Sequence, residues 1–340
     1  MYYALLKHLL FRFDPETAHR LTLRALKIAH FYGLSALFPK IPAMPVTVFG
    51  LTFPNPIGLA AGLDKNGDYI EALSALGFGF VEIGTITPKP QIGNPTPRLF
   101  RLEDQQAIIN RMGFNNKGVD YLADQLKKTD YQGILGINIG KNRDTGNDKA
   151  IDDYLYCFRR VYPYASYVTV NISSPNTTAL RELQHGDLLR SLLHALKREQ
   201  QLQFELQKRY VPLVVKIAPD LSTIELEAIA DILLAEEIDG VIATNTTLSR
   251  EGVEASPFSS EAGGLSGKPL FASSTAVVKQ LSSLLQNKIP IIAAGGIMTP
   301  EDAVNKLKAG ATLIQLYSGL IYEGPGLISD IARALITKNF

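Results

Sequence analysis

The chain has 340 residues, of which 46% are hydrophobic and 20% are charged, and its net charge is +1 at pH 7. This is the composition of a globular protein with a large core, and the near-neutral charge gives no indication of a nucleic-acid partner. A single cysteine, Cys157, excludes a disulfide framework and a thiolate metal site, and no apolar run reaches the roughly 18 residues of a membrane span.

The first forty residues predict two amphipathic helices. Apolar residues recur at helical spacing as far as Phe13, and Asp14-Pro15 marks the start of a second helix that runs to about Tyr32. Residues 1–40 carry a net charge of +4, which leaves −3 for the rest of the chain. Such a basic, apolar hairpin is typical of an element that lies on a membrane surface, but the pattern equally fits a helical pair packed on the body with a solvated basic face.

No secretory signal is expected, because charged residues interrupt the N-terminal apolar stretch, and this favours a reducing, cytoplasmic setting. Pro39, Pro42 and Pro45 form a stiff linker, so we divide the chain into an N-terminal element, residues 1–40, and a body, residues 41–340.

The body alternates strand and helix patterns after a short hairpin expected at Val46–Phe53. Eight short apolar runs predict strands buried on both faces: Pro56–Ala60, Phe80–Gly84, Ile134–Ile139, Tyr167–Asn171, Leu213–Ile217, Gly240–Ala243, Ile291–Ala294 and Leu313–Tyr317. Helices are predicted at Gly67–Leu76, Lys117–Lys128, Asp153–Tyr162, Asp187–Tyr210, Ile224–Glu236, Ser273–Leu285, Pro300–Ala309 and Leu327–Thr337. Eight such units predict an α/β fold of the (β/α)₈ TIM-barrel type. A doubly wound sheet is the alternative, but the GxGxxG turn that would favour it is missing.

In such a barrel, functional groups lie at the C-terminal ends of the strands. The predicted strand ends carry small residues, amides, hydroxyls and two lysines, and Asp64 is nearly their only carboxylate. This argues against glycoside hydrolysis, which needs paired carboxylates, and against a metal site. A rim of this kind favours a large, polar, anionic ligand.

Glycines follow the last two predicted strands. Gly295-Gly296 comes after the seventh and Ser318-Gly319 after the eighth, where barrels usually bind phosphate. Gly264–Gly267 predicts a further loop that approaches a ligand closely. Together these features predict a phosphorylated cofactor across the mouth of the barrel.

The fourth predicted strand ends in Asn171-Ile-Ser-Ser-Pro-Asn176, and its proline ends the strand. Each carboxamide offers a donor and an acceptor to a planar, amide-rich ligand. Ser174 beside them can move a proton if another group takes it onward. Taken alone, a polar turn is the simpler interpretation, but similar groups at other strand ends favour a site.

These motifs resemble those of the dihydroorotate dehydrogenases, specifically the membrane-associated, quinone-dependent class 2. The resemblance runs nearly end to end, and its motifs are Ala60–Gly67, Glu82–Thr85, Asn110–Asn116, Gly136–Asn142, Asn171–Asn176, Lys216–Asp220 and Ile242–Thr247. It implies an FMN-dependent oxidation of (S)-dihydroorotate to orotate, with a quinone as electron acceptor, in de novo pyrimidine (UMP) biosynthesis. It also implies a monomer that is peripheral to the cytoplasmic face of the cell membrane.

The resemblance assigns one FMN per chain and the substrate to specific residues. The flavin would contact Ala61, Gly62, Leu63, Asp64, Lys65, Thr85, Asn138, Asn171, Lys216, Thr244, Gly267, Gly296, Tyr317 and Ser318. The substrate would contact Lys65, Asn110, Arg111, Met112, Gly113, Phe114, Asn171, Asn176, Asn245 and Thr246. Lys216 would lie near the flavin N1/O2 edge, where negative charge builds on reduction, and Lys65 would oppose the substrate carboxylate.

Ser174 matches the family's catalytic base, which takes the C5 proton while hydride leaves C6 for the flavin. The proton would then pass through water or a neighbouring hydroxyl such as Thr178. The soluble classes carry cysteine at this position and lack the basic hairpin, so both features indicate the quinone class. In that class the hairpin caps a quinone tunnel beside residues matching His19, Arg101 and Tyr317. For His19 a surface helical histidine is the alternative.

Two other functions fit parts of the pattern. One is a related FMN barrel, either a hydroxy-acid oxidase or a soluble class that uses fumarate or NAD, although no histidine occupies a predicted strand end. The other is a non-catalytic, membrane-bound barrel that senses a phosphorylated metabolite. The loop Thr177–Gly186 is predicted to be either a lid or a plain connector, and Glu251–Glu261 has no evident role.

Overall fold

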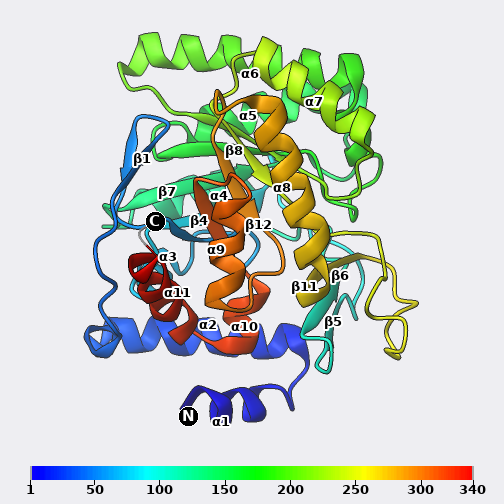
Figure 1. Cartoon of the computed structure of the whole chain (residues 1–340). Coiled ribbons are helices and arrows are strands. Elements are labelled where there is room, and N and C mark those ends of the chain that lie inside the picture. Colours follow the sequence, from blue (N-terminus) through cyan, green and yellow to red (C-terminus); the bar gives the residue numbers. More distant parts are fainter. Residues whose placement is uncertain (1, 339–340) are drawn as a thin grey trace.

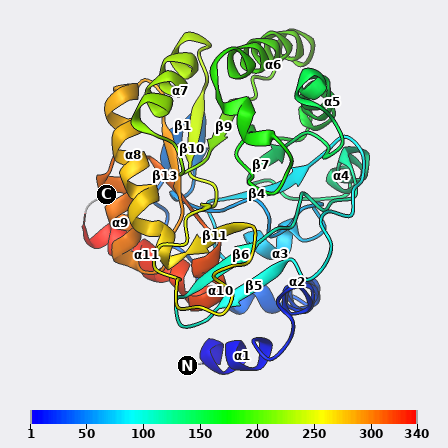
Figure 2. The ribbon, with the colours of Figure 1, turned by 90° about the vertical axis from the view of Figure 1, so that its right-hand side faces the viewer.

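The computed structural model describes residues 2–338 and contains a closed barrel of eight parallel strands (Figures 1 and 2). In order around the barrel these are β3 (Ile57–Leu59), β4 (Phe80–Ile86), β7 (Ile134–Ile139), β8 (Tyr167–Asn171), β9 (Leu213–Ile217), β10 (Gly240–Ala243), β12 (Ile291–Ala294) and β13 (Leu313–Leu316). Strand β13 pairs in parallel with β3 and closes the ring. The predicted (β/α)₈ barrel is confirmed, and closure excludes the doubly wound sheet.

Helices surround the strands, as Figure 2 shows. They are α3 (Ile70–Ser74), α4 (Val119–Leu126), α5 (Ala150–Val161), α6 (Gly186–Gln207), α7 (Thr223–Ala235), α8 (Phe271–Leu285), α9 (Pro300–Lys308) and α11 (Gly326–Thr337). Helix α3 is shorter than predicted, because the Asp64 carboxylate accepts hydrogen bonds from three backbone N–H groups at residues 66–69 and holds that segment in turns. Cys157 is fully buried on α5, as expected of a structural thiol.

The predicted hairpin, β1 (Val46–Val48) with β2 (Leu51–Phe53), closes the N-terminal end of the barrel. Phe53 is fully buried and meets Phe80 edge to face, with ring centroids 5.1 Å apart. Both rings belong to an apolar cluster that includes Tyr167 inside the barrel. The functional cavity lies at the opposite end, where the strands finish.

A small antiparallel sheet, absent from the sequence prediction, covers part of that end. It consists of β5 (Leu99–Leu102), β6 (Ala107–Asn110) and β11 (Gly264–Gly267), with β6 in the centre. The prediction of a loop at Gly264–Gly267 is therefore wrong, because all four residues pair with β6. The short helix α10 (Ser318–Glu323) follows β13 at the same end.

The N-terminal element contains α1 (Tyr2–Leu10), α2 (Pro15–Phe31) and a short 3₁₀ helix, η1 (Leu34–Leu37), and lies along the lower side of Figure 1. As predicted, Asp14 caps α2 by accepting a hydrogen bond from the Thr17 backbone N–H. Ala18 and Leu23 are buried on the inner face of α2.

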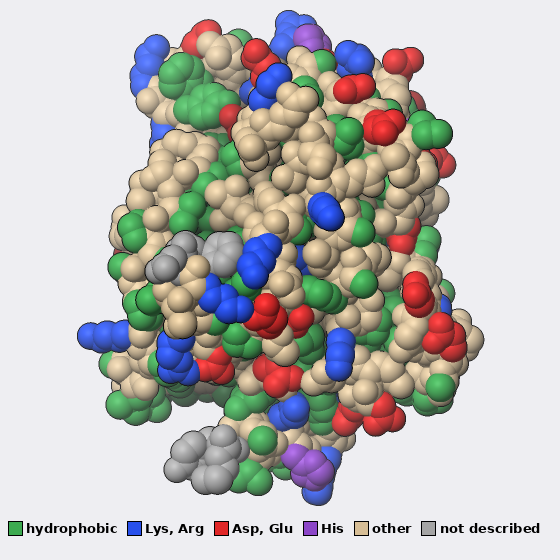
Figure 3. Space-filling model, viewed as in Figure 1, with side chains coloured by type: hydrophobic (Ala, Val, Ile, Leu, Met, Phe, Trp, Pro, Cys, Tyr) green, Lys and Arg blue, Asp and Glu red, His purple; other side chains and the backbone are tan. Residues whose placement is uncertain are grey.

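The outer side of this element leaves many large apolar side chains in solvent, and hydrophobic atoms appear along the lower edge of Figure 3. Exposed fractions reach 70% for Leu5 and 81% for Phe31 and Leu37. The exposed set is Leu5, Leu6, Leu9, Phe13, Leu21, Ile28, Phe31, Tyr32, Leu34 and Leu37. The element is thus packed on the barrel and also presents an apolar surface. Within residues 2–338, no helix has the length and apolar content needed to cross a bilayer.

Candidate active site

One continuous cavity of about 760 Å³ joins the mouth of the barrel to the N-terminal helices. Its polar end is walled by the strand ends and the β5–β6–β11 sheet, and its apolar end by the inner faces of α1 and α2. This volume is in the range of small-molecule and cofactor sites. Polar and apolar ligands can therefore meet within one enclosure.

Most of the residues predicted to form the site line this cavity. From the expected cofactor set these are Ala61, Gly62, Leu63, Lys65, Thr85, Asn171, Lys216, Thr244, Gly267, Gly296, Tyr317 and Ser318. From the substrate set they also include Asn110, Met112, Gly113, Phe114, Asn176, Asn245 and Thr246, together with Ser174, His19 and Arg101.

Two expected cofactor residues, Asp64 and Asn138, do not line the cavity. The Asp64 carboxylate is occupied by backbone N–H groups of its own loop, at 2.7 Å from that of Tyr69. Asn138 is fully buried inside the barrel, where its Nδ2 donates to Glu82 Oε1 at 2.9 Å. Its Oδ1 accepts from the Thr85 hydroxyl at 2.5 Å. Both side chains support the wall of the cavity from behind, and their direct contact with the cofactor stays a prediction.

Arg111, expected among the substrate residues, also points away from the cavity. Its guanidinium forms an ion pair with Glu261 at 2.5 Å and lies 4.6 Å from the centre of the Phe100 ring. The alternating direction of side chains along an extended segment places Arg111 on the outside while Asn110 and Met112 line the cavity. Its contact with the substrate stays a prediction, and the ion pair gives the Glu251–Glu261 loop a structural anchor.

A buried carboxylate inside the barrel escaped the sequence prediction. Glu82 on β4 accepts hydrogen bonds from the Tyr167 hydroxyl at 2.9 Å and from Gln315 Nε2 at 2.8 Å, besides that from Asn138. The negative charge of Glu82 raises the pKa of Lys216 and so opposes the lowering that burial causes. Strand alternation places Glu82 inside the barrel, but its partners come from three other strands and could not be read from its own motif.

Lys216 lies at the floor of the cavity. It is 6% exposed, and no hydrogen bond of its ammonium to residues 2–338 is found. Burial lowers the pKa of Lys216, and Glu82 partly offsets this. Gln315 also lines the cavity, and its Oε1 is buried without a partner in the described chain. Since buried polar atoms are nearly always paired, both groups favour a ligand with hydrogen-bonding edges.

The glycine-rich end of the cavity offers backbone N–H groups. Gly296 has φ +76°, a conformation that favours glycine, and a Cβ there would lie 2.4 Å from Phe271 backbone atoms. No backbone acceptor for its N–H is found among residues 2–338. The first N–H groups of α10 also lack acceptors within their helix. Donors of this kind suit a phosphate.

The end of the cavity that holds the predicted substrate residues, called the substrate end below, is built from linked carboxamides. Asn176 Nδ2 donates to the Asn110 backbone carbonyl at 3.0 Å. Asn245 Nδ2 donates to Asn171 Oδ1 at 3.3 Å, and Asn171 Nδ2 in turn donates to the Thr85 hydroxyl at 2.9 Å. These contacts fix which face of each amide presents oxygen or nitrogen. The arrangement can therefore read the C=O and N–H edges of a planar ring.

Ser174 is buried beside these amides, and its Oγ accepts a hydrogen bond from the Asn176 backbone N–H at 3.2 Å. A serine hydroxyl needs a further acceptor for the proton that it takes. Thr178, suggested from sequence, is exposed, whereas Thr177 has a buried hydroxyl that finds no partner within residues 2–338. Thr177 is therefore the better candidate for the relay, because an unpaired buried hydroxyl is available for a water or proton.

Lys65 donates from Nζ to the Gly62 carbonyl at 2.7 Å and also lines the cavity. Burial lowers the pKa of Lys65 to about 8, the nearby Arg98 guanidinium adds to this, and Glu16 and Asp64 oppose it. Glu16 itself pairs with Arg98 at 2.6 Å, which ties α2 to the barrel. Lys65 thus remains a cation near neutral pH but one that titrates within reach of experiment.

His19 lies at the junction of the polar and apolar ends, so the alternative of a surface histidine is wrong. Its Nε2 lies 2.8 Å from the Leu63 carbonyl and is therefore assigned as the protonated nitrogen. Burial, and then Lys65, lower the pKa of His19 to about 4, so the ring is neutral at physiological pH. The His19 ring therefore serves as a hydrogen-bond donor in a fixed orientation and carries no charge.

Arg101 and Tyr317 flank the same junction. Arg101 donates to the Phe11 carbonyl at 2.8 Å and also to that of Phe13, and its guanidinium lies 4.4 Å from the centre of the Phe11 ring. It holds the turn between α1 and α2 against β5. Burial raises the pKa of Tyr317 to about 12. The three residues of the predicted tunnel therefore line one cavity.

Residues 43–338 match the model of the dihydroorotate dehydrogenase family. Proteins named dihydroorotate dehydrogenase (quinone) from Methylobacillus flagellatus and Nitrosomonas eutropha are both 58% identical to this chain. The match to the first covers 98% of this chain and 100% of the relative. The match to the second covers 100% of this chain and 99% of the relative. The Chromobacterium violaceum protein of the same name is 59% identical over 98% of this chain and 97% of its own.

Solved structures agree. The Eimeria tenella DHODH structure with ferulenol has a TM-score of 0.86 and 40% identity, and covers 96% of this chain and 91% of its own. The ligand-free form has a TM-score of 0.87 and 41% identity, and covers 95% of this chain and 94% of its own. The family model begins only at residue 43, whereas the quinone-named relatives also match the N-terminal helices.

Proposed function

Because the chain belongs to the dihydroorotate dehydrogenase family and catalyses the quinone-dependent oxidation of dihydroorotate to orotate in pyrimidine biosynthesis, we propose that the cavity at the mouth of its barrel holds FMN between a substrate end and a quinone end. The observation that carries this proposal is the continuity of the cavity. Linked amides and Ser174 occupy one end, and the apolar faces of α1 and α2 enclose the other.

The residues at the cavity floor fit an FMN molecule. Lys216, whose ammonium has no hydrogen-bond partner among residues 2–338, would face the ring edge that becomes negative. Gln315 Oε1, also unpaired within those residues, would accept from an N–H of the ring. The backbone at Gly296 and the start of α10 would hold the phosphate. When bound, FMN supplies the hydride acceptor and the route for electrons to the quinone.

The substrate end accounts for the protein's part in the chemistry. Lys65 would oppose the carboxylate of dihydroorotate, and the amides would orient its ring, since a polar edge left unpaired there costs about 1–3 kcal/mol. Ser174 would accept the C5 proton and pass it toward Thr177 or a water, while the C6 hydrogen leaves with its electron pair. Burial keeps bulk water away from this step.

The apolar end would admit the quinone beside His19, Arg101 and Tyr317. The exposed apolar side chains of the N-terminal element would rest on a lipid surface, so that a lipid-dissolved quinone enters between α1 and α2. We propose peripheral attachment at the cytoplasmic face of the cell membrane, and a monomer.

The cofactor assignment is tested by releasing the bound flavin with acid and identifying it by mass spectrometry. One FMN per chain is expected. Release of FAD, or a purified protein that stays colourless after incubation with FMN, would contradict it.

Orotate binding should weaken as pH rises through about 8. With a pKa of about 8, Lys65 is a cation below that pH and attracts the carboxylate, and above it the ammonium is lost. The dissociation constant, followed by the flavin spectrum, should then rise by up to about tenfold per pH unit. Lys65→Met should bind weakly throughout and lose the dependence. If the dissociation constant for orotate stays the same from pH 7 to 9.5 in the unmodified protein, Lys65 does not oppose the carboxylate.

A further inference from the structure

The segment that follows Ser174 is fixed to the barrel rather than free. Within the loop Thr177–Gly186, residues Leu180–Gln184 form a 3₁₀ helix, η3, whose Leu180, Leu183 and Gln184 side chains are buried. Gln184 Oε1 accepts a hydrogen bond from the Ala218 backbone N–H at 2.8 Å. Whether the segment acts as a lid or as a plain connector, it contains an ordered element next to the site.

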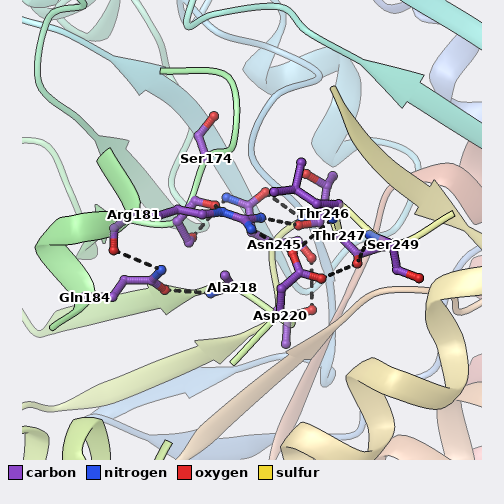
Figure 4. A network of polar contacts seen from close by, with 12 residues as sticks. Ser174, Arg181, Gln184, Ala218, Asp220, Asn245, Thr246, Thr247 and Ser249 are labelled. Atoms are coloured by element: carbon purple, nitrogen blue, oxygen red, sulfur yellow. Dashed lines mark hydrogen bonds and ion pairs between the residues drawn. The ribbon is translucent and has the colours of Figure 1, made fainter. Parts of the chain in front are cut away.

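Arg181 on η3 joins three separate loops at the rim of the barrel (Figure 4). Its Nε donates to the Ser173 carbonyl at 3.1 Å, after β8. One Nη donates to the Asp220 carboxylate at 2.7 Å, after β9, and the other to the Thr246 carbonyl at 2.9 Å, after β10. A single planar guanidinium thus sets the spacing of three strand ends.

Asp220 is itself held from the other side. Its carboxylate accepts from the Leu248 backbone N–H at 3.0 Å and from the Thr247 hydroxyl. The Arg181 and Asp220 side chains are only 20% and 25% exposed, so solvent screens the pair less than a surface pair. A lysine cannot replace this arrangement, because its single ammonium does not reproduce the planar fork of donors.

The two carbonyls that Arg181 holds belong to segments that carry the chemistry. Ser173 directly precedes Ser174, and its hydroxyl accepts from Asn245 Nδ2 at 3.0 Å. Thr246 and Asn245 line the substrate end of the cavity. Arg181 lies outside the cavity lining, so it acts through these neighbours rather than on the substrate.

We propose that Arg181 is a positioning residue for the half-reaction in which dihydroorotate reduces the flavin. By tying the backbone before Ser174 to the backbone of Thr246, it keeps the base and the substrate amides at a fixed separation. The inference rests on the proposed function of Ser174 and of these amides. Without the three-way contact, the two backbones lose their direct tie and depend on the hydrogen bonds of the Asn245 side chain, while the cofactor floor at Lys216 remains in place on β9.

The test is anaerobic stopped-flow reduction of the purified, flavin-loaded Arg181→Met variant by dihydroorotate. The saturating rate of flavin reduction should fall by about 10–10²-fold, the loss that a misplacement on the order of 1 Å produces. Reoxidation of the reduced variant by a soluble quinone should keep its normal rate, because that step uses the other end of the cavity. Arg190→Met, an exposed arginine on neighbouring α6, is the matched control and should behave as the unmodified protein.

Arg181→Lys distinguishes a positional role from a charge effect and should be nearly as slow as Arg181→Met. The proposal is overturned by normal flavin reduction in Arg181→Met, by full recovery in Arg181→Lys, or by equal slowing of both half-reactions with loss of flavin, which would indicate general destabilisation. If dihydroorotate fails to bleach the unmodified protein, the proposed function fails instead, independently of Arg181.

Discussion

Replacement of Ser174 by alanine is expected to slow flavin reduction by dihydroorotate by about 10²–10⁴-fold while FMN stays bound. The side chain is buried among the substrate amides, and its oxygen is positioned by the Asn176 backbone N–H. Alanine removes the proton acceptor but leaves those amides and the cofactor floor unchanged. Anaerobic stopped-flow absorbance of the flavin measures the rate, and the visible spectrum before mixing measures cofactor content.

Thr178→Ala is the matched control for this variant, because Thr178 is an exposed hydroxyl four residues along the same loop. It should reduce flavin at the unmodified rate. A Ser174→Ala protein that retains its flavin and turns over within a factor of two or so of normal would remove Ser174 from the role of base.

Deletion of residues 1–40 should leave flavin reduction by dihydroorotate intact and impair reduction of the quinone. Leu10, Leu23 and Leu26 contribute to the apolar end of the cavity and are lost with the deletion. If about 100 Å² of a quinone's apolar surface is left in water, binding weakens by about 2.5 kcal/mol. This corresponds to a rise in the KM for quinone of roughly 10²-fold. Steady-state assays with a soluble quinone, beside stopped-flow reduction, measure the two effects.

A full-length variant separates the cavity wall from the membrane surface. Leu5→Ser with Leu9→Ser changes two side chains that are 70% and 54% exposed, and neither lines the cavity. Sedimentation with anionic lipid vesicles should show weaker binding of this variant, while a short-chain soluble quinone is reduced normally. Unchanged quinone kinetics in the deletion would contradict the position of the tunnel.

The sequence predicted the barrel and many of the residues that line its cavity, because both depend on local patterns. Short apolar runs between helical segments identified all eight strands, and parallel strands bring their C-terminal ends to one edge. The β5–β6–β11 sheet was missed because its strands do not belong to strand–helix units: β5 and β6 follow each other with no helix between them, and β11 begins and ends with glycine. The alternation that identified the barrel strands therefore gives no signal for this sheet.

Side-chain direction and long-range partners were beyond the sequence. Arg111 lies within a motif whose neighbours do line the cavity, yet it turns outward to Glu261. Glu82 is paired by residues from other strands inside the barrel. Arg181 looks like a solvated loop residue until the fold brings Asp220 and Thr246, 39 and 65 positions away in sequence, to its guanidinium. These contacts are determined by tertiary packing, not by local pattern.

The most direct test of the whole account is an anaerobic visible spectrum of the purified protein, with dihydroorotate added first and a soluble quinone second. The protein is expected to be yellow, to be bleached by dihydroorotate, and to recover its colour with the quinone but not with fumarate. A bound flavin that dihydroorotate does not bleach, or that recovers only with fumarate, would contradict it.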